Sequence, residues 1–145
     1  MSRGIPTVAA GLVLVAAVAV PATEPVAFKV IVNAKVTGGT IARDAVAQVY
    51  LGKARRWADG TTVVAVDLSS TSAVRQAFSE AVLAMPVDAV KNYWLRMLAK
   101  GKRPPVTKQS DDDVIAFVAA EPGGIGYVAE ATPVPATVRT ITVHP

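Results

Sequence analysis

The stretch VVAVDLSSTSAVRQAFSEAVLAM, residues 63–85, places a predicted strand, a loop and a predicted helix in direct succession. Residues 63–66 form a short apolar run that predicts a buried strand. Further along, apolar residues recur at the spacing i, i+3, i+4, i+7, i+8 and i+11, which predicts a helix with one buried face. They are Val74, Ala77, Phe78, Ala81, Val82 and Met85, and Pro86 follows as a helix terminator. A strand joined to a helix in this way is typical of α/β proteins.

Further strands and helices alternate on both sides of this stretch. The sequence predicts strands over residues 28–33, 125–128 and 138–143, and helices over residues 41–51 and 88–99. Another helix begins at Ser110, which precedes three aspartates as a capping residue does, and runs to about residue 120. Residues 34–40 and 100–110 are expected to be loops. We therefore expect one α/β domain over residues 23–145, with a mostly parallel sheet flanked by helices.

The segment PGGIGYV, residues 122–128, predicts a tight turn into the buried strand at 125–128. Glycine at these positions permits positive φ angles and close packing of neighbouring elements. The aromatic residues Trp57, Tyr93 and Trp94 fall at turn or helix-packing positions. They are therefore interpreted as core residues, and stacking against a ligand is the alternative.

The first 22 residues have the plan of a secretory signal peptide. Arg3 and the amino terminus are positively charged, residues 8–20 are apolar or small, and Val20 and Ala22 occupy the small-residue positions of a cleavage site. A helix of these thirteen residues spans roughly 20 Å, against about 30 Å for a bilayer core, which disfavours the alternative of a membrane anchor. We expect cleavage after Ala22 and a periplasmic or secreted mature protein without membrane insertion.

Composition excludes several classes of function. The chain has no cysteine and one histidine, His144, beside the C-terminus, which excludes thiol catalysis and the usual zinc sites. No glycine-rich phosphate loop of a nucleotide-binding protein is present. Arg3 is one of 15 basic residues, so 14 basic and 11 acidic residues remain after cleavage, without the basic stripe of a nucleic-acid-binding protein. We expect a protein that is not an enzyme, with no cofactor, no metal and no nucleic acid.

The most informative chemistry is the hydroxyl cluster between the strand at 63–66 and the next helix. Ser69, Ser70, Thr71 and Ser72 precede the first helical turn, where free backbone N–H groups and the helix dipole attract an anion. Hydroxyl groups donate hydrogen bonds to oxyanion oxygens, and Arg75 can add a charge-assisted contact. The candidate ligand-binding residues are therefore Ser70, Thr71, Ser72 and Arg75. The alternative is that Ser72 only caps the helix while the other hydroxyls contact water.

Arg75 is expected to lie off the buried face of its helix, where it would contact the ligand and contribute little to folding. A cation in the first turn opposes the helix dipole by about 0.3–1 kcal/mol. An ion pair with Asp67 would offset this cost without any ligand. Both explanations stay open at the level of the sequence.

Several motifs, in order, resemble the phosphate-binding proteins of ABC transporters, within the type II periplasmic binding superfamily. Residues 44–60, DAVAQVYLGKARRWADG, are similar to that family's helix followed by Gly-Lys, Trp and Asp-Gly. Residues 63–78 resemble its strand, serine-rich loop and Arg-x-x-Phe helix, and residues 122–128 resemble its Pro-Gly-x-Ile-Gly-Tyr-Val strand. The resemblance covers residues 28–133. It implies the fold of a single lobe, because full-length members have two lobes and about twice this length.

The resemblance also identifies departures in the phosphate loop. The family's pattern is Arg, three residues, then Ser-Gly-Thr, and alignment on Phe78 places Ser72 on the Ser. Leu68, Ala73 and Val74 then replace the Arg, the Gly and the Thr, so two contacting side chains are changed.

The resemblance implies an extracytoplasmic module that binds inorganic phosphate or a similar oxyanion, with a protein partner or a dimer completing the half-site. The departures favour the alternative of a structural or protein-interaction module that has kept the lobe and lost the ligand.

Overall fold

The computed structural model describes residues 2–7, 9–18 and 26–145. Residues 2–7 and 9–18 are exposed and have no regular secondary structure. The cleavage site expected after Ala22 lies outside the described residues, so the signal peptide stays a prediction. Within the described ranges, no helix has the length and apolar character that crossing a membrane requires.

One six-stranded sheet forms the centre of the fold. Its strands are β1 (Phe28–Asn33), β2 (Thr40–Ala42), β3 (Val64–Leu68), β4 (Val106–Lys108), β5 (Gly124–Ala129) and β6 (Val138–His144), in the spatial order β2-β6-β1-β5-β3-β4. The pairs β2–β6, β3–β4 and β3–β5 are parallel, whereas β1 is antiparallel to both β5 and β6. Five strands therefore point the same way and β1 alone is reversed, which confirms a mostly parallel α/β sheet.

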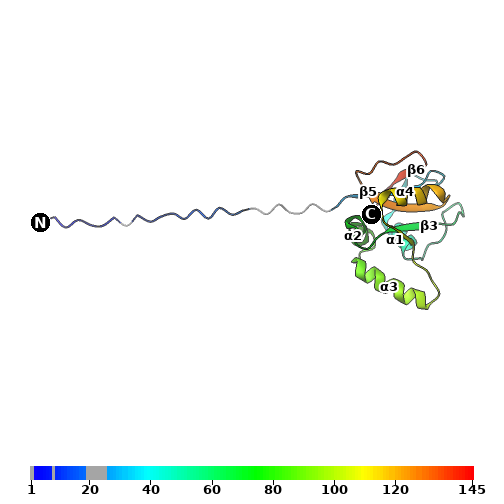
Figure 1. The fold of residues 1–145 in the computed structure, drawn as a ribbon, viewed down its shortest axis with the longest axis horizontal. Coiled ribbons are helices and arrows are strands. Elements are labelled where there is room, and N and C mark those ends of the chain that lie inside the picture. The colour runs from blue at the N-terminus through cyan, green and yellow to red at the C-terminus, as the bar shows by residue number, and fades with distance from the viewer. Residues whose placement is uncertain (1, 8, 19–25) are drawn as a thin grey trace.

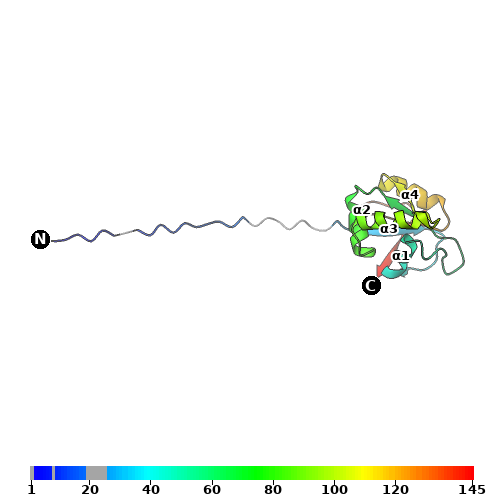
Figure 2. The same cartoon turned by 90° about the horizontal axis from the view of Figure 1, so that it is seen from below.

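Helices cover both faces of this sheet. On one face α4 (Asp111–Ala120) packs across β5, β3 and β1, and on the other α1 (Arg43–Tyr50) and α2 (Ala73–Val82) pack side by side (Figure 1). The fourth helix, α3 (Val87–Ala99), packs against α2 and lies in front of the sheet in Figure 2.

Two consecutive residues of β5 determine how these layers fit. Gly126 faces α4, and a Cβ atom there would lie 2.8 Å from Val114 and 2.9 Å from Val66. The next residue, Tyr127, faces the opposite layer, because successive strand residues alternate between the faces. Its ring stacks on Phe78 of α2 with centroids 3.8 Å apart. The close packing predicted for the glycine segment is confirmed, but neither Gly123, Gly124 nor Gly126 has a positive φ angle.

The predicted helices and long strands are confirmed within a few residues, with three differences. Residues 40–42 and 106–108 form the short outer strands β2 and β4, where we expected a helix start and a loop. Ala81 is exposed, although its spacing placed it on the buried face of α2. Phe78 and Val82 are buried as predicted, and Arg75 and Ser79, which the apolar pattern did not include, are buried as well.

Candidate functional site

The hydroxyl cluster lies between the carboxyl end of β3 and the start of α2, as the sequence predicted. Ser72 is the N-cap residue of α2, and its Oγ accepts a hydrogen bond from the backbone N–H of Arg75 at 3.3 Å. The N–H groups of Ala73 and Val74 are the first two of the helix and have no intrahelical partner. An anion placed on the axis of α2 would therefore meet free amides and the positive end of the helix dipole.

Two of the four candidate ligand-binding residues are exposed to solvent. Ser70 and Thr71 are exposed and Ser72 is half-buried. The hydroxyls of Thr71 and Ser69 are hydrogen-bonded to each other at 3.1 Å. The loop therefore offers hydroxyl groups to a ligand without any movement of the backbone.

Arg75 lies elsewhere than the sequence pattern indicated. It is 8% exposed, and its guanidinium Nη1 lies 2.5 Å from the Asp67 carboxylate. The same Nη1 donates to the backbone carbonyl of Leu68 at 3.0 Å. Its Nε is buried without a hydrogen-bond partner among the described residues. The expectation of an exposed cation off the buried face is wrong, and the ion pair with Asp67 is the explanation that the structure supports.

The ion pair belongs to a buried network that includes two tyrosines. The Tyr127 hydroxyl donates to the Asp67 carboxylate and accepts from the backbone N–H of Leu68 at 3.2 Å. Tyr50 donates to the carbonyl of Val66 at 2.8 Å. Burial raises the pKa values of Tyr50 and Tyr127 well above the ordinary value of a tyrosine, so their hydroxyls stay protonated. The sequence indicated Asp67 as a possible partner for Arg75, but nothing in it linked Tyr127 to this network.

The charge around the loop is not uniformly favourable to an anion. A cavity of about 280 Å³ borders Ser70, and its lining includes Glu80 and Asp88. These two carboxylates make one side of the hydroxyl cluster unfavourable for a negative ligand. The favourable approach is therefore along the axis of α2, toward the amides of Ala73 and Val74.

The aromatic residues Trp57, Tyr93 and Trp94 have packing roles. The indole N–H of Trp57 donates to the carbonyl of Gly123 at 3.0 Å, and the Tyr93 hydroxyl donates to that of Leu51 at 2.7 Å. Trp94 is buried in the core. All three therefore pack in or against the core, as interpreted, with Trp57 and Tyr93 partly buried, and Trp94 also borders a cavity. In the part of the chain that the structure describes, no group of three or more acidic or histidine side chains could hold a metal ion.

The fold is similar to solved phosphate receptors. An ABC-type phosphate transport receptor from Vibrio cholerae matches with a TM-score of 0.64 and 13% identity, over 81% of this chain and 46% of that one. A phosphate ABC transporter substrate-binding protein from Clostridium perfringens, solved with bound phosphate, matches with a TM-score of 0.65 and 16% identity, over 81% and 45%. PstS from Borrelia burgdorferi matches with a TM-score of 0.63 and 12% identity, over 83% and 49%.

The chain has the fold of part of a phosphate-type substrate-binding protein. This confirms the resemblance of the motifs at the level of the fold, which 81–83% of the chain shares with these three structures. The chain spans less than half the length of each of them. The Vibrio cholerae and Clostridium perfringens neighbours are described as a transport receptor and a transporter substrate-binding protein. No protein-family model and no curated protein matches the sequence.

Proposed function

We propose that this protein is an extracytoplasmic binding module for phosphate or a similar oxyanion, of the substrate-binding type found with ABC transporters. One observation carries the proposal: free amides and exposed hydroxyls come together at the start of α2, in the fold of phosphate-binding proteins. The ligand would accept hydrogen bonds from the N–H groups of Ala73 and Val74 and from the hydroxyls of Ser70, Thr71 and Ser72. The protein would act in binding and not in catalysis.

The charges around the start of α2 lead us to expect a low affinity for phosphate. Arg75 remains in the proposed ligand set, but its side chain is buried and its Nη1 already contacts the Asp67 carboxylate and the Leu68 carbonyl. Hydrogen bonds from neutral groups are weaker than those from a free guanidinium. We expect a dissociation constant on the order of 1 mM for phosphate from this chain alone. A protein partner or a second copy that closes over the anion would increase the affinity.

Two serine variants test the proposal against a matched control. Ser72 caps α2 and Ser110 caps α4 in the same way, each accepting from the backbone N–H three residues on, at 3.3 and 3.2 Å. Replacing either with alanine should reduce stability by about 1 kcal/mol. In calorimetric titrations with phosphate, Ser72→Ala should weaken binding several-fold, whereas Ser110→Ala should bind as the wild type does. Equal binding by both variants would refute a site at α2.

The second candidate function is a structural or protein-interaction module with this lobe fold. The Arg75–Asp67 pair favours it, because Asp67 compensates the charge of the buried Arg75 guanidinium without any ligand. The two carboxylates beside Ser70 favour it as well. If phosphate and sulfate up to about 10 mM give neither heat nor a thermal shift, this second function replaces the first.

Export is part of the proposal. It is supported by the sequence of the first 22 residues, which combines a cationic start, an apolar run and a small-residue end. The mass of the protein recovered from a periplasmic extract tests it. Loss of residues 1–22 is the expected result, and a full-length species in the membrane fraction would contradict it.

A further inference from the structure

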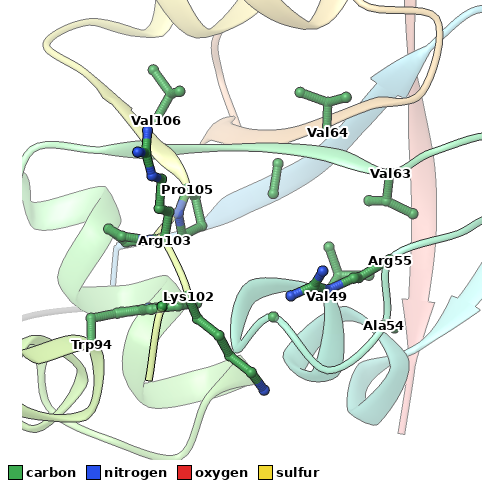
Figure 3. A pocket seen from close by; sticks show the side chains of 14 residues that line it. Val49, Ala54, Arg55, Val63, Val64, Trp94, Lys102, Arg103, Pro105 and Val106 are labelled. Atoms are coloured by element: carbon green, nitrogen blue, oxygen red, sulfur yellow. The ribbon is translucent and has the colours of Figure 1, made fainter. Parts of the chain in front are cut away.

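A second cavity, about 450 Å³ in volume, lies at the opposite end of β3 from the hydroxyl cluster. Its walls are the loop after α1, the first residues of β3 and the loop that leads into β4 (Figure 3). Val64 and Ala65, the first two residues of β3, line it together with the preceding Val63, whereas the hydroxyl cluster follows Leu68. With a rise of 3.3 Å per strand residue, the two sites are about 13 Å apart along β3. They are therefore separate sites.

The charge of this cavity is positive. Arg55, Lys102 and Arg103 line it, and among the described residues of the lining none is acidic. Figure 3 shows Arg55 on the loop after α1 and Lys102 on the loop before β4, with Arg103 extending beside Val106. The one ion pair between described residues is Arg75–Asp67, so none of these three cations is neutralised by a carboxylate there. Three unneutralised cations around one cavity concentrate an attractive potential for anions.

The rest of the lining is apolar and aromatic. Trp94 packs against Gly52, where a Cβ atom would lie 2.9 Å from the indole ring. Gly52 has a φ angle of +72°, which glycine adopts without strain and which lets the loop and the indole meet. Pro104 and Pro105 form another part of the wall. Rigid apolar walls with a few charged groups are typical of small-molecule sites, and so is a volume in the range of about 300–1,000 Å³.

We propose that this cavity binds a small organic anion, namely a phosphate ester or phosphonate that carries an apolar or aromatic group. The guanidinium groups of Arg55 and Arg103 can each donate two parallel hydrogen bonds to phosphate oxygens, and Lys102 adds a third cation. The apolar group would lie against Trp94 and the two prolines. Inorganic phosphate can contact the cations of this site but has no apolar group to contact its walls, so we expect it to bind more weakly.

The test uses phenyl phosphate as the probe. Inorganic phosphate and phenol are the control ligands, because each carries only the anionic or only the aromatic part of the probe. The chain has two tryptophans, Trp57 and Trp94, so Trp57→Phe leaves the indole in the cavity wall as the only one. In that background, phenyl phosphate should change the fluorescence of Trp94 saturably. Phosphate and phenol should each bind with at least tenfold lower affinity than phenyl phosphate. A salt titration should weaken the binding of phenyl phosphate, because Arg55 and Arg103 are exposed.

Two matched pairs of substitutions identify the cations. The double variant Lys102→Gln/Arg103→Gln should bind phenyl phosphate at least tenfold more weakly than the wild type, and Arg55→Gln alone should bind it several-fold more weakly. The control is Arg96→Gln with Lys100→Gln, which removes the same charges from exposed positions on α3 and just after it, outside this cavity, and should change binding less than twofold. Ser72→Ala should also leave this binding unchanged, which separates the inference from the proposed site at α2. The inference would be overturned if the Trp94 fluorescence change fails to saturate up to about 10 mM phenyl phosphate, or if the two double variants weaken the binding of phenyl phosphate equally.

Discussion

At the residue scale, the Arg75 guanidinium and the Asp67 carboxylate depend on each other. Both are buried, and each is the ionic partner of the other. A buried ion pair adds little net stability compared with apolar residues, but removing one partner leaves the other as an uncompensated charge. Arg75 is therefore interpreted as a residue that fixes the start of α2 on β3, in addition to any contact with a ligand.

Arg75→Ala should lower the free energy of unfolding by about 3–5 kcal/mol, because it leaves the buried Asp67 carboxylate without a compensating charge. Arg96→Ala is the control, since Arg96 is exposed on α3, and it should change stability by less than about 0.5 kcal/mol. Denaturant unfolding of both variants measures the difference. A loss below about 1 kcal/mol for Arg75→Ala would show that the ion pair does not form in solution.

The same carboxylate gives a prediction about pH. Burial raises the pKa of Asp67 above its ordinary value, against the opposing effects of the Arg75 charge and the hydrogen bond from Tyr127. The folded state therefore holds this proton more tightly than the unfolded state does. The resulting contribution to stability is complete below the ordinary pKa of about 3.9 and is lost as the pH rises through the raised pKa.

Asp67→Asn removes this titration while leaving the other carboxylates in place. The free energy of unfolding of the wild type, minus that of Asp67→Asn, should therefore decrease as the pH is raised from about 4. Urea unfolding of both proteins at a series of pH values measures it. A difference that grows with pH would show that Arg75 lowers the pKa of Asp67 more than burial raises it.

At the element scale, α4 and the sheet approach closely only because β5 presents a glycine to this helix. An added methyl group at Gly126 would meet buried side chains of Val114 and Val66 at less than 3 Å. Gly126→Ala should therefore cost about 1–3 kcal/mol of stability through overpacking. Gly39→Ala is the control, because no atom lies within 4 Å of its would-be Cβ and its φ is not positive. Thermal unfolding that shows equal stability for the two variants would mean that α4 packs differently.

The elements also show which information the sequence contains. The helices α2 and α3 follow from apolar periodicity, and the starts of α2 and α4 follow from the capping residues Ser72 and Ser110, because these signals are local to each helix. The strands β2 and β4 do not, because each has three residues and exists through pairing with a strand distant in sequence. The orientation of Arg75 was missed for a related reason. The helical pattern counts apolar residues only, whereas Arg75 is buried by a polar partner on β3.

The position of the candidate site is predictable from the sequence, and its electrostatics are not. Hydroxyl residues after a strand and before a helix indicate an anion-binding helix start without any structure. The two carboxylates beside Ser70 belong to α2 and to the start of α3, and only the packing of these two helices brings them to one cavity. Likewise, Arg55 and Lys102 are far apart in the sequence and line one cavity only in the folded domain.

At the scale of the whole molecule, the two proposed anion sites lie at opposite ends of β3. The start of α2 offers amides and hydroxyls, whereas the cavity at the beginning of β3 offers free cations and apolar walls. The chain corresponds to less than half of the solved phosphate receptors it resembles. At the proposed phosphate site we therefore expect the affinity to depend on what covers that end of the sheet, and we expect the chain alone to bind phosphate weakly.

The most direct test of the central claim is a phosphate titration of the ¹⁵N-labelled protein followed by amide NMR. The backbone N–H signals of Ser70, Ala73 and Val74 should shift saturably, because these groups surround the proposed anion position at the start of α2. The amide signals at the start of α4, which is capped by Ser110 in the same way, should not shift and are the internal control. No saturable shift at α2 up to about 10 mM phosphate, or equal shifts at both helix starts, would contradict the account.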